Sequence, residues 1–271
     1  MLAMTEQAPV LETTSQGRTL AGRVRSGLAP LVLLVTLILL WEILVRALGV
    51  REFTLPAPSS IAATLVEDAD SLSSHFLVTF GQTLLGYGAA VALGIPLAFL
   101  IAYSRLAERT LYPLLVTAQS IPKVAIAPIL VMWMGFGILP KVVLIILICI
   151  FPVVVSCASG LRSTDEEFVE LSRSLDASEW QIFRKVRFPA ALPQTFVGLK
   201  VAMTLAVIGA VVGEFSGADA GLGFVVIIAG GTANTSLAFA SILLLSIMSI
   251  GLFYALVALE RVVVPWAASE E

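Results

Sequence analysis

The sequence contains little charge. Only 13% of its 271 residues are Asp, Glu, Lys or Arg, whereas 58% are hydrophobic. Soluble domains carry about 25% charged residues. The composition therefore excludes an ordinary soluble protein and favours one that is embedded in lipid.

Cysteine and histidine are almost absent. Cys149 and Cys157 lie within one apolar run, where a thiol behaves as a small buried hydrophobe, and they provide neither a disulfide framework nor a zinc site. The single histidine, His75, has no second His or Cys near it, and metal sites need several ligands. We therefore expect His75 to be a solvated loop residue and the chain to hold no metal.

Motifs for catalysis are missing as well. No Gly-x-x-x-x-Gly-Lys-Ser/Thr phosphate loop occurs, so the chain is not expected to hydrolyse ATP itself. No pairing of a nucleophile with a base is apparent at either membrane surface. These absences disfavour a membrane enzyme, and we expect this chain to bind no cofactor.

The sequence consists instead largely of long apolar runs. About 20 apolar residues are needed to cross roughly 30 Å of bilayer hydrocarbon as a helix. Six runs qualify, approximately Leu28–Leu48, Thr79–Tyr103, Leu111–Met134, Lys141–Gly160, Gln194–Gly213 and Ala238–Glu260. We therefore predict an all-α, polytopic membrane protein with about six transmembrane helices and a polar hairpin between the fourth and fifth.

The basic residues are distributed unevenly between the two sides of this topology. With the N-terminus inside, 12 of the 16 Lys and Arg residues fall on inner segments and three, Arg46, Arg51 and Lys141, on outer ones. Cytoplasmic loops carry an excess of Lys and Arg. The distribution predicts that both termini and the polar hairpin face the cytoplasm.

The runs divide the chain into four regions. We expect a flexible tail at 1–26, the first transmembrane helix and an outer loop at 27–78, a core at 79–262 that contains the hairpin at 164–189, and a C-terminal tail at 263–271. A short helix in the outer loop is expected to begin near Ser59 or Ser60, because Ser is a good cap.

Glycine and alanine recur in two places within the core. Gly86, Ala90 and Gly94 follow a four-residue spacing that lets membrane helices approach closely, although Gly is also simply tolerated in lipid. The Gly-rich residues 217–223 follow Glu214 and predict a non-helical turn. We place this turn at the outer mouth of a pathway.

The polar hairpin begins with a capping signature. Thr164 as N-cap and Glu167 at the third helical position fit a capping box. Phe168, Leu171 and Leu175 then recur at helical spacing and predict one narrow apolar stripe.

A second capping box, formed by Ser178 and Gln181, predicts a helix from about Glu179 to Arg187, which Pro189 and Pro193 then break. Trp180 and Phe183 lie near its tip or base. Neither helix is long enough to be stable alone, so each must pack on the membrane helices, on a partner, or on both. An ordinary helical loop without a partner is the alternative.

The hairpin resembles the EAA signature of bacterial ABC importer permeases, in which Glu-Ala-Ala, a later Gly and Ile-x-Leu-Pro form the coupling helix. Glu170-Leu171-Ser172, Asp176 and Val186-Arg187-Phe188-Pro189 stand at those positions. From about Thr79 to Arg261 the chain is similar to the nitrate, sulfonate and taurine branch of these permeases. The similarity includes residues 121–125, 133–137 and 221–223.

The resemblance implies a permease subunit that imports a small polar or anionic solute by alternating access. It implies a bacterial cytoplasmic (inner) membrane location and these partners: a dimer of cytoplasmic ATPases that uses ATP and Mg, a second permease copy expected to form a homodimer, and a periplasmic or extracellular solute-binding protein, with no nucleic acid. The residues it assigns to ATPase coupling are Glu170, Leu171, Ser172, Leu175, Asp176, Ala177, Ser178, Trp180, Phe183 and Pro189.

The sequence departs from the signature at three positions. Leu171 and Ser172 replace the two alanines, and Asp176 replaces the turn glycine. Asp adopts the left-handed backbone conformation more readily than most residues with a Cβ, so the turn can form. Its added charge can also change how the hairpin docks.

Two ionisable residues are candidates for the translocation path. Lys123 is expected about 12 residues into the third helix, roughly 18 Å along its axis and near the bilayer centre. A charge there is costly unless it faces water or a partner, so Lys123 either lines the path for an anionic or carbonyl-rich solute or donates to a backbone carbonyl freed by Pro122. Glu214 is expected at the membrane interface, at the outer end of the fifth helix, with or without a gating role.

The alternative is a secondary transporter or channel that works alone. Such proteins commonly show internal repeats and intramembrane acidic residues, and neither is evident in this sequence. The solute itself cannot be named from the chain.

Overall fold

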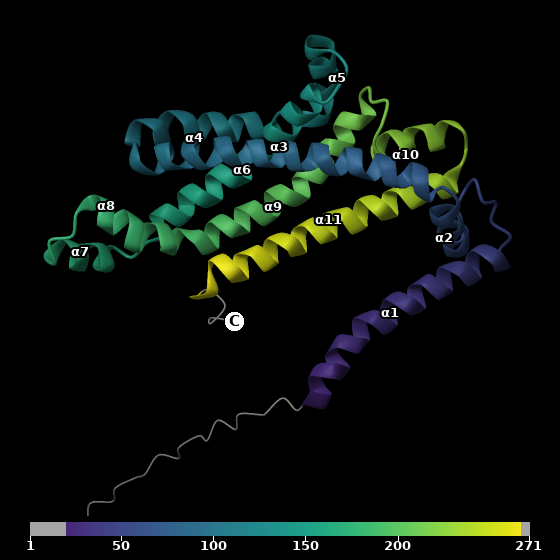
Figure 1. Ribbon diagram of the computed structural model, residues 1–271, viewed down its shortest axis with the longest axis horizontal. Coiled ribbons are helices and arrows are strands. Elements are labelled where there is room, and N and C mark those ends of the chain that lie inside the picture. Colours follow the sequence, from purple (N-terminus) through teal and green to yellow (C-terminus); the bar gives the residue numbers. More distant parts are fainter. Residues whose placement is uncertain (1–19, 267–271) are drawn as a thin grey trace, which may run out of the picture. The chain divides into compact units, whose positions relative to one another are not determined.

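The computed structural model describes residues 20–266, and these residues form helices and connecting turns without a β-strand (Figure 1). Residues up to Val50 and residues from Arg51 onward form two separate units. The first unit contains one helix, α1 (Leu20–Ala47), most of whose described side chains are exposed. The predicted tail at 1–26 lies mostly outside the described residues, and residues 20–26 belong to α1.

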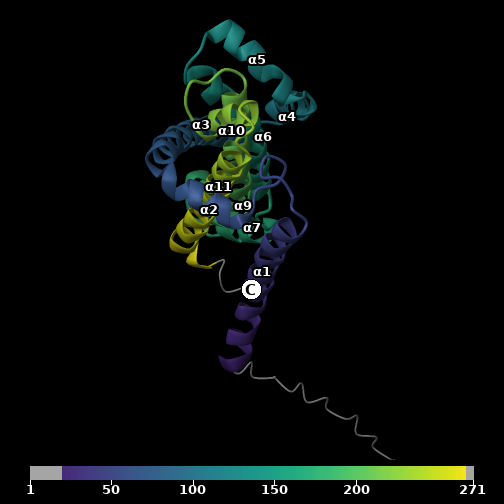
Figure 2. The same ribbon diagram turned by 90° about the vertical axis from the view of Figure 1, so that its right-hand side faces the viewer.

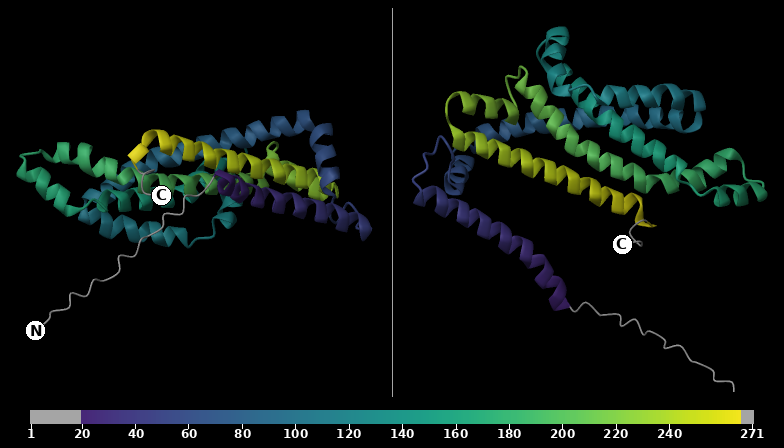
Figure 3. Two further views of the ribbon diagram at one scale, coloured as in Figure 1. Left: turned by 90° about the horizontal axis from the view of Figure 1, so that it is seen from below. Right: turned by 180° about the vertical axis from the view of Figure 1, so that it is seen from behind.

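The second unit contains all the other helices. Their bounds are α2 (Pro58–Glu67), α3 (Ala69–Tyr103), α4 (Arg105–Gln119), α5 (Lys123–Met134), α6 (Leu139–Arg162), α7 (Glu166–Ser174), α8 (Glu179–Ile182), a π-helical turn (Phe183–Arg187), α9 (Phe188–Phe215), α10 (Leu222–Gly231) and α11 (Thr235–Val263). The hairpin of α7 and α8 lies at one end of this unit and α10 at the other (Figures 1 and 3).

Helices α3, α6 and α9 form the core of the second unit. A Cβ atom on Gly86 of α3 would lie 2.6 Å from Ile145 of α6, and one on Gly94 would lie 2.7 Å from Val153. Ala90, between the two glycines, is fully buried. The predicted close approach along this small-residue ladder is therefore confirmed, because no larger side chain fits between α3 and α6.

Five helical segments of residues 20–266 are long and apolar enough to cross a membrane, and a sixth would be the pair α4 and α5. This pair corresponds to the predicted run Leu111–Met134, but its two helices are bent by 95° at a break. The expectation of one continuous third helix is wrong. The break comprises residues 120–122 and therefore includes Pro122. The residue before a proline avoids the helical conformation, which explains why the helix is interrupted here. Figure 2 shows α5 at the top of the second unit, where its Ala127 and Leu130 are buried.

Two other boundaries differ from the prediction. The run expected to begin at Thr79 begins at Ala69, so most of the predicted outer loop is helical. The short helix expected near Ser59 or Ser60 starts at Pro58 with Ala57 as N-cap, because a proline is well suited to the first helical position. The C-terminal tail at 263–271 lies outside the described residues beyond Trp266.

Candidate functional site

The hairpin leaves α6 through a short turn and begins with a side-chain cap. Asp165 is the N-cap of α7, and its Oδ1 accepts a hydrogen bond from the Glu167 N–H at 3.1 Å. The predicted capping box of Thr164 and Glu167 is therefore wrong by one residue. Asp and Thr are both good caps. Thr164 is not available because its hydroxyl is buried beside the end of α6, without a hydrogen-bond partner among the described residues.

The turn between α7 and α8 depends on Asp176. Its φ is 56°, the left-handed conformation that favours glycine, as predicted for this position. The Asp176 N–H donates to the Arg173 carbonyl at 3.0 Å, and the Ala177 N–H donates to the Ser172 carbonyl at 3.1 Å. These bonds satisfy carbonyl groups at the end of α7. The turn thus forms without the glycine of the family signature.

The second predicted capping box is confirmed. The Gln181 N–H donates to Ser178 Oγ at 3.3 Å, and the Ser178 N–H donates to Gln181 Oε1 at 2.8 Å. Arg173 of α7 and Glu179 of α8 form an ion pair of 2.9 Å across the turn. Because both side chains are largely exposed, this pair contributes little to stability. It restricts how far the two helices can separate.

The prediction that Pro189 and Pro193 break the helix is wrong. The π-helical turn leads directly into α9, and residues 179–215 form one long candidate membrane segment. Pro189 lies in the first turn of α9, directly after the π-helical turn. The wider π turn just before it accommodates the proline ring, which would otherwise clash with a carbonyl in the preceding turn. The hairpin is therefore joined to α9 without a flexible linker.

Phe183 fixes the base of the hairpin to the core. Its ring centroid lies 5.6 Å from that of Phe99 and 6.1 Å from that of Tyr103, both on α3. It also lies 5.4 Å from the ring of Trp180 and 5.9 Å from that of Phe188. The edge-to-face geometry with α3 is favourable for aromatic pairs. Phe183 therefore connects the base of the hairpin to α3 as well as to α9.

The outer face of α7 is apolar and exposed. Phe168, Leu171 and Leu175 are 62%, 58% and 75% exposed, so the predicted stripe has no partner among residues 20–266. Val169 of α7 and Ile182 of α8 are buried instead and attach the hairpin to the rest of the unit. The sequence prediction missed these two residues, although Val169 follows directly after the stripe's first member.

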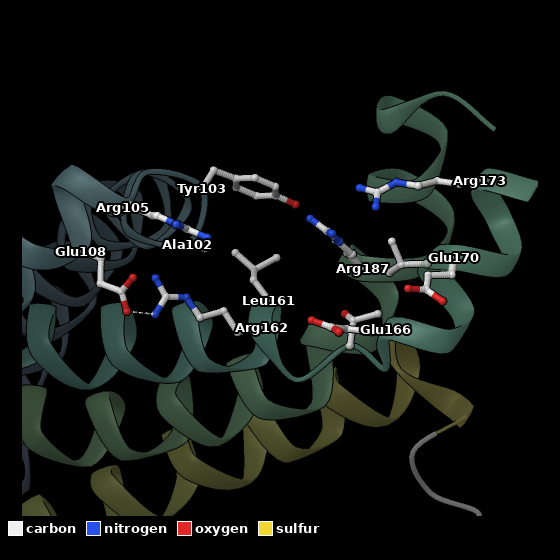
Figure 4. Close-up of a pocket in the computed structure, with 12 residues that line it drawn as sticks. Ala102, Tyr103, Arg105, Glu108, Leu161, Arg162, Glu166, Glu170, Arg173 and Arg187 are labelled. Carbon is white, nitrogen blue, oxygen red and sulfur yellow. Dashed lines mark hydrogen bonds and ion pairs between the residues drawn. The ribbon is translucent and has the colours of Figure 1, made fainter. Parts of the chain in front are cut away.

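A polar pocket of 660 Å³ separates the hairpin from the ends of α3, α4 and α6 (Figure 4). Glu166, Glu170 and Arg173 line it from the hairpin side, and Arg105 and Arg162 line it from the opposite side. Arg162 is held by an ion pair with Glu108 and by a 2.6 Å bond to the Ile101 carbonyl. Glu170 therefore belongs to the helix with the exposed apolar stripe, and it lines a pocket that also contains Arg105, Arg162 and Arg173.

A second polar arrangement lies at the other end of the unit and is called the Glu214 cluster here: Thr79, Lys141, Glu214 and the backbone of residues 221–223. Glu214 is only 1% exposed. Its Oε1 accepts a hydrogen bond from the Thr79 hydroxyl at 2.8 Å, and its Oε2 accepts one from the Gly223 N–H at 2.7 Å. Glu214 thus lies near the end of α9, as expected, and its carboxylate is buried within the protein.

The Glu214 cluster holds the first turn of α10. The Leu222 N–H donates to the Thr79 hydroxyl at 2.8 Å, and a carboxylate is favoured at a helix N-terminus. Lys141, expected on an outer segment, is 4% exposed and lies close enough to interact with Glu214. The predicted non-helical turn after Glu214 is confirmed, with φ of 135° at Gly217 and 118° at Gly221.

His75 takes part in the same region. It lies in α3, and its Nδ1 accepts a hydrogen bond from the Gly221 N–H at 3.0 Å. The expectation of a solvated loop histidine is therefore wrong. Within residues 20–266, no three His, Cys, Asp or Glu side chains are grouped closely enough to hold a metal ion. Cys149 and Cys157 are buried in α6, as predicted.

Lys123 is the first residue of α5 and not the middle of a continuous helix. Its Nζ donates to the carbonyl and to the side-chain Oε1 of Gln119, both at 2.9 Å. The ammonium group therefore bridges the break between α4 and α5. This geometry matches the alternative in which Lys123 donates to a backbone carbonyl at the break. A role of Lys123 in the translocation path stays a prediction.

Residues 90–268 match the family described as the binding-protein-dependent transport system inner membrane component. The chain belongs to this family. It is the permease subunit of an ABC importer and not an enzyme, since its ATP-hydrolysing partner is a separate chain. The alternative of a transporter or channel working alone is thereby set aside.

This permease has well-covered relatives. It is 36% identical over 240 residues to the formylaminopyrimidine transport permease protein ThiX of Halalkalibacterium halodurans, which spans 88% of this chain and 96% of the relative. It is 30% identical over 254 residues to the putative aliphatic sulfonates transport permease protein SsuC of Bacillus subtilis, with 92% of each covered. These relatives confirm the predicted sulfonate and taurine branch.

A solved structure of the MetNI methionine ABC transporter in an inward-facing conformation matches the fold of this permease with a TM-score of 0.60. The match has 22% identity and covers 69% of this chain and 96% of the other. The shared fold confirms the all-α membrane architecture of the permease. The family match, in turn, identifies the chain as an inner-membrane component with several apolar helices.

Proposed function

We propose that the hairpin of this permease is the surface on which its partner ATPase acts. The observation that carries the proposal is the contrast within the hairpin. Val169 and Ile182 are buried and Phe183 contacts α3, whereas Phe168, Leu171 and Leu175 are exposed. A free apolar stripe on an anchored element fits the helix-in-groove mode of recognition.

The remaining predicted residues support the same surface. Glu170 and Ser172 lie on α7, Asp176 and Ala177 form the turn, and Ser178 caps α8. Trp180 is 66% exposed beside the base. Pro189 lies where the hairpin enters α9. Movement of the hairpin by the ATPase would therefore shift α9 and α3 together, a rigid-body change of the kind used in alternating access.

The proposed assembly contains two copies of this chain, a cytoplasmic dimer of ATPases that uses ATP and Mg, and a solute-binding protein on the outer side. Both termini and the hairpin face the cytoplasm in this arrangement, as the positive-inside distribution indicates. This chain itself binds no cofactor. Its helices provide the path, and the lipid bilayer is its solvent.

The solute is proposed to be small and polar or anionic. The relatives are named for formylaminopyrimidine and for aliphatic sulfonates, which share small size and polar groups but not charge. In the proposed path, Lys123 attracts an anionic or carbonyl-rich solute at the break between α4 and α5. Glu214 acts indirectly by holding α10, because its carboxylate already accepts hydrogen bonds from Thr79 and Gly223.

Replacing Leu175 by Glu tests the docking surface. Leu175 is 75% exposed, so the substitution should leave the fold intact while it places a charge in the ATPase groove. We expect the amount of ATPase that co-purifies with the permease to fall about tenfold or more, the effect of losing an interface hot spot.

The matched control is Val66→Glu on α2, which is 78% exposed at the opposite end of the unit. This variant should retain the ATPase as the parent chain does. Equal retention by Leu175→Glu and the parent, with both proteins inserted in the membrane, would contradict the proposal.

A further inference from the structure

An apolar groove lies at the base of the hairpin and shares no lining residue with the polar pocket. It has a volume of 530 Å³ and is lined by Phe99, Trp180, Phe183, Arg184 and Phe188. Four of these five residues present aromatic rings, and only Arg184 carries a charge. No other part of residues 51–266 lines this groove.

A second cavity of 210 Å³ adjoins the groove, because Phe99 and Phe188 line both. It extends toward the core between α3, α6 and α9 and is lined by apolar side chains such as Ile95, Leu192 and Leu199. The hydroxyl of Thr195 in its wall already donates to the Ala191 carbonyl at 2.8 Å. A cavity without free polar groups does not hold water, but it does accept hydrocarbon.

The groove has one basic residue in its lining, Arg184, and a second, Lys185, follows it in the chain. Arg184 and Lys185 belong to the π-helical turn and are exposed, and neither has an ion-pair or hydrogen-bond partner among residues 20–266. Arg187 of the same turn faces the other way, with its guanidinium 5.9 Å from the centroid of Tyr103 and lining the polar pocket. The turn therefore leaves the unpaired charge of Arg184 in the lining of the groove and that of Lys185 at the next position in the chain.

The position of the groove fits the edge of a bilayer. The turn joins the polar hairpin to α9, at the end of the long apolar segment 179–215. The predicted topology places this end at the cytoplasmic leaflet, which contains anionic lipids, and basic pockets between membrane helices on this side bind anionic headgroups. A soluble partner could present acidic groups to the basic residues of the turn. It would provide no acyl chain to occupy the inner cavity.

We propose that the groove and the adjoining cavity bind one anionic phospholipid. Its acyl chain occupies the cavity past Phe99 and Phe188, and its phosphate lies at Arg184 and Lys185. Because Phe183 lines the groove and fixes the hairpin to α3, the bound lipid becomes part of the hairpin's base. Trp180 and Phe183 also belong to the proposed ATPase surface, but the lipid is tested with the permease alone, so failure of this proposal would leave the proposed function intact.

The fluorescence of Trp180, which lines the groove, provides the test. In the full-length chain with Trp41, Trp133 and Trp266 replaced by Phe, Trp180 is the only tryptophan. The chain is reconstituted in vesicles that contain brominated phosphatidylglycerol or brominated phosphatidylcholine, whose bromines quench a neighbouring indole. We expect phosphatidylglycerol to associate more strongly, and Arg184→Gln or Lys185→Gln to lower this preference about fivefold each.

Two further variants separate a specific site from a general attraction. Arg109→Gln removes an exposed basic residue of α4 that does not line the groove, and it should leave the preference unchanged. Leu192→Phe fills the inner cavity and should reduce quenching by both lipids. Equal quenching by the two lipids in the parent chain, or an equal loss in Arg109→Gln, would overturn the proposal.

Discussion

The two ends of the second unit are built in opposite ways. At the α10 end, charged groups are buried and satisfied by partners from α3, α9 and α10. At the hairpin end, apolar groups are exposed and few residues attach α7 and α8 to the core. The α10 end is therefore fixed by its own interactions, whereas the hairpin end keeps an exposed apolar face, on which the proposed ATPase would dock.

The largest effect is expected from Glu214→Ala. This substitution leaves the Thr79 hydroxyl, the Gly223 N–H and the Lys141 ammonium without their buried partner. Leaving a buried hydrogen-bonding group without its partner costs about 1–3 kcal/mol, and more where the partner is charged. The free energy of unfolding in mild detergent should fall by this amount.

Glu214→Gln is the matched control, since its amide keeps the shape and one acceptor, and it should be less destabilising than Glu214→Ala. A loss below about 1 kcal/mol for Glu214→Ala, the scale of a single ordinary hydrogen bond, would remove the contrast between the two ends.

A smaller effect is expected from Gly86→Ala in the core that joins the ends. The new Cβ would lie 2.6 Å from Ile145, so α3 and α6 must separate. Overpacking of this kind costs about 1–3 kcal/mol. Gly88→Ala on the same helix meets nothing within 4 Å and should not destabilise the protein. Equal unfolding free energies for the two variants would show that α3 and α6 are not closely packed.

The smallest effect is expected at the hairpin turn. Asp176→Gly relieves a left-handed residue with a Cβ and should raise stability by at most about 1 kcal/mol. Asp176→Val should lower stability, since a β-branched residue is strained at positive φ. Resistance of the hairpin to limited proteolysis measures both changes. A stabilising Asp176→Val would show that the turn does not adopt this conformation.

The parts of the fold that depend on local signals could be predicted from the sequence. The capping box of Ser178 and Gln181, the left-handed turn at Asp176 and the apolar runs each depend on residues close together in the chain. The cap of α7 was misplaced by one residue, since Thr164 and Asp165 are both suitable. The choice between them depends on how the chain leaves α6.

The parts that depend on distant contacts could not be predicted. Glu214 and Thr79 are 135 positions apart, and no local pattern indicates that their side chains form a buried hydrogen bond. Phe183 was identified as a hairpin residue, but its partners Phe99 and Tyr103 belong to α3. Pro122 is a local signal for the break before α5. The apolar run continues on both sides of this proline, and for this reason one continuous helix was predicted.

The central claim is that the free apolar face of the hairpin contacts the ATPase. A photo-activatable cross-linker placed at position 175 in intact cells tests it most directly, with the same group at position 66 as reference. We predict a cross-linked product with the cytoplasmic ATPase from position 175 and none from position 66. A product from position 175 with the external binding protein, or with no protein at all while import continues, would contradict the account.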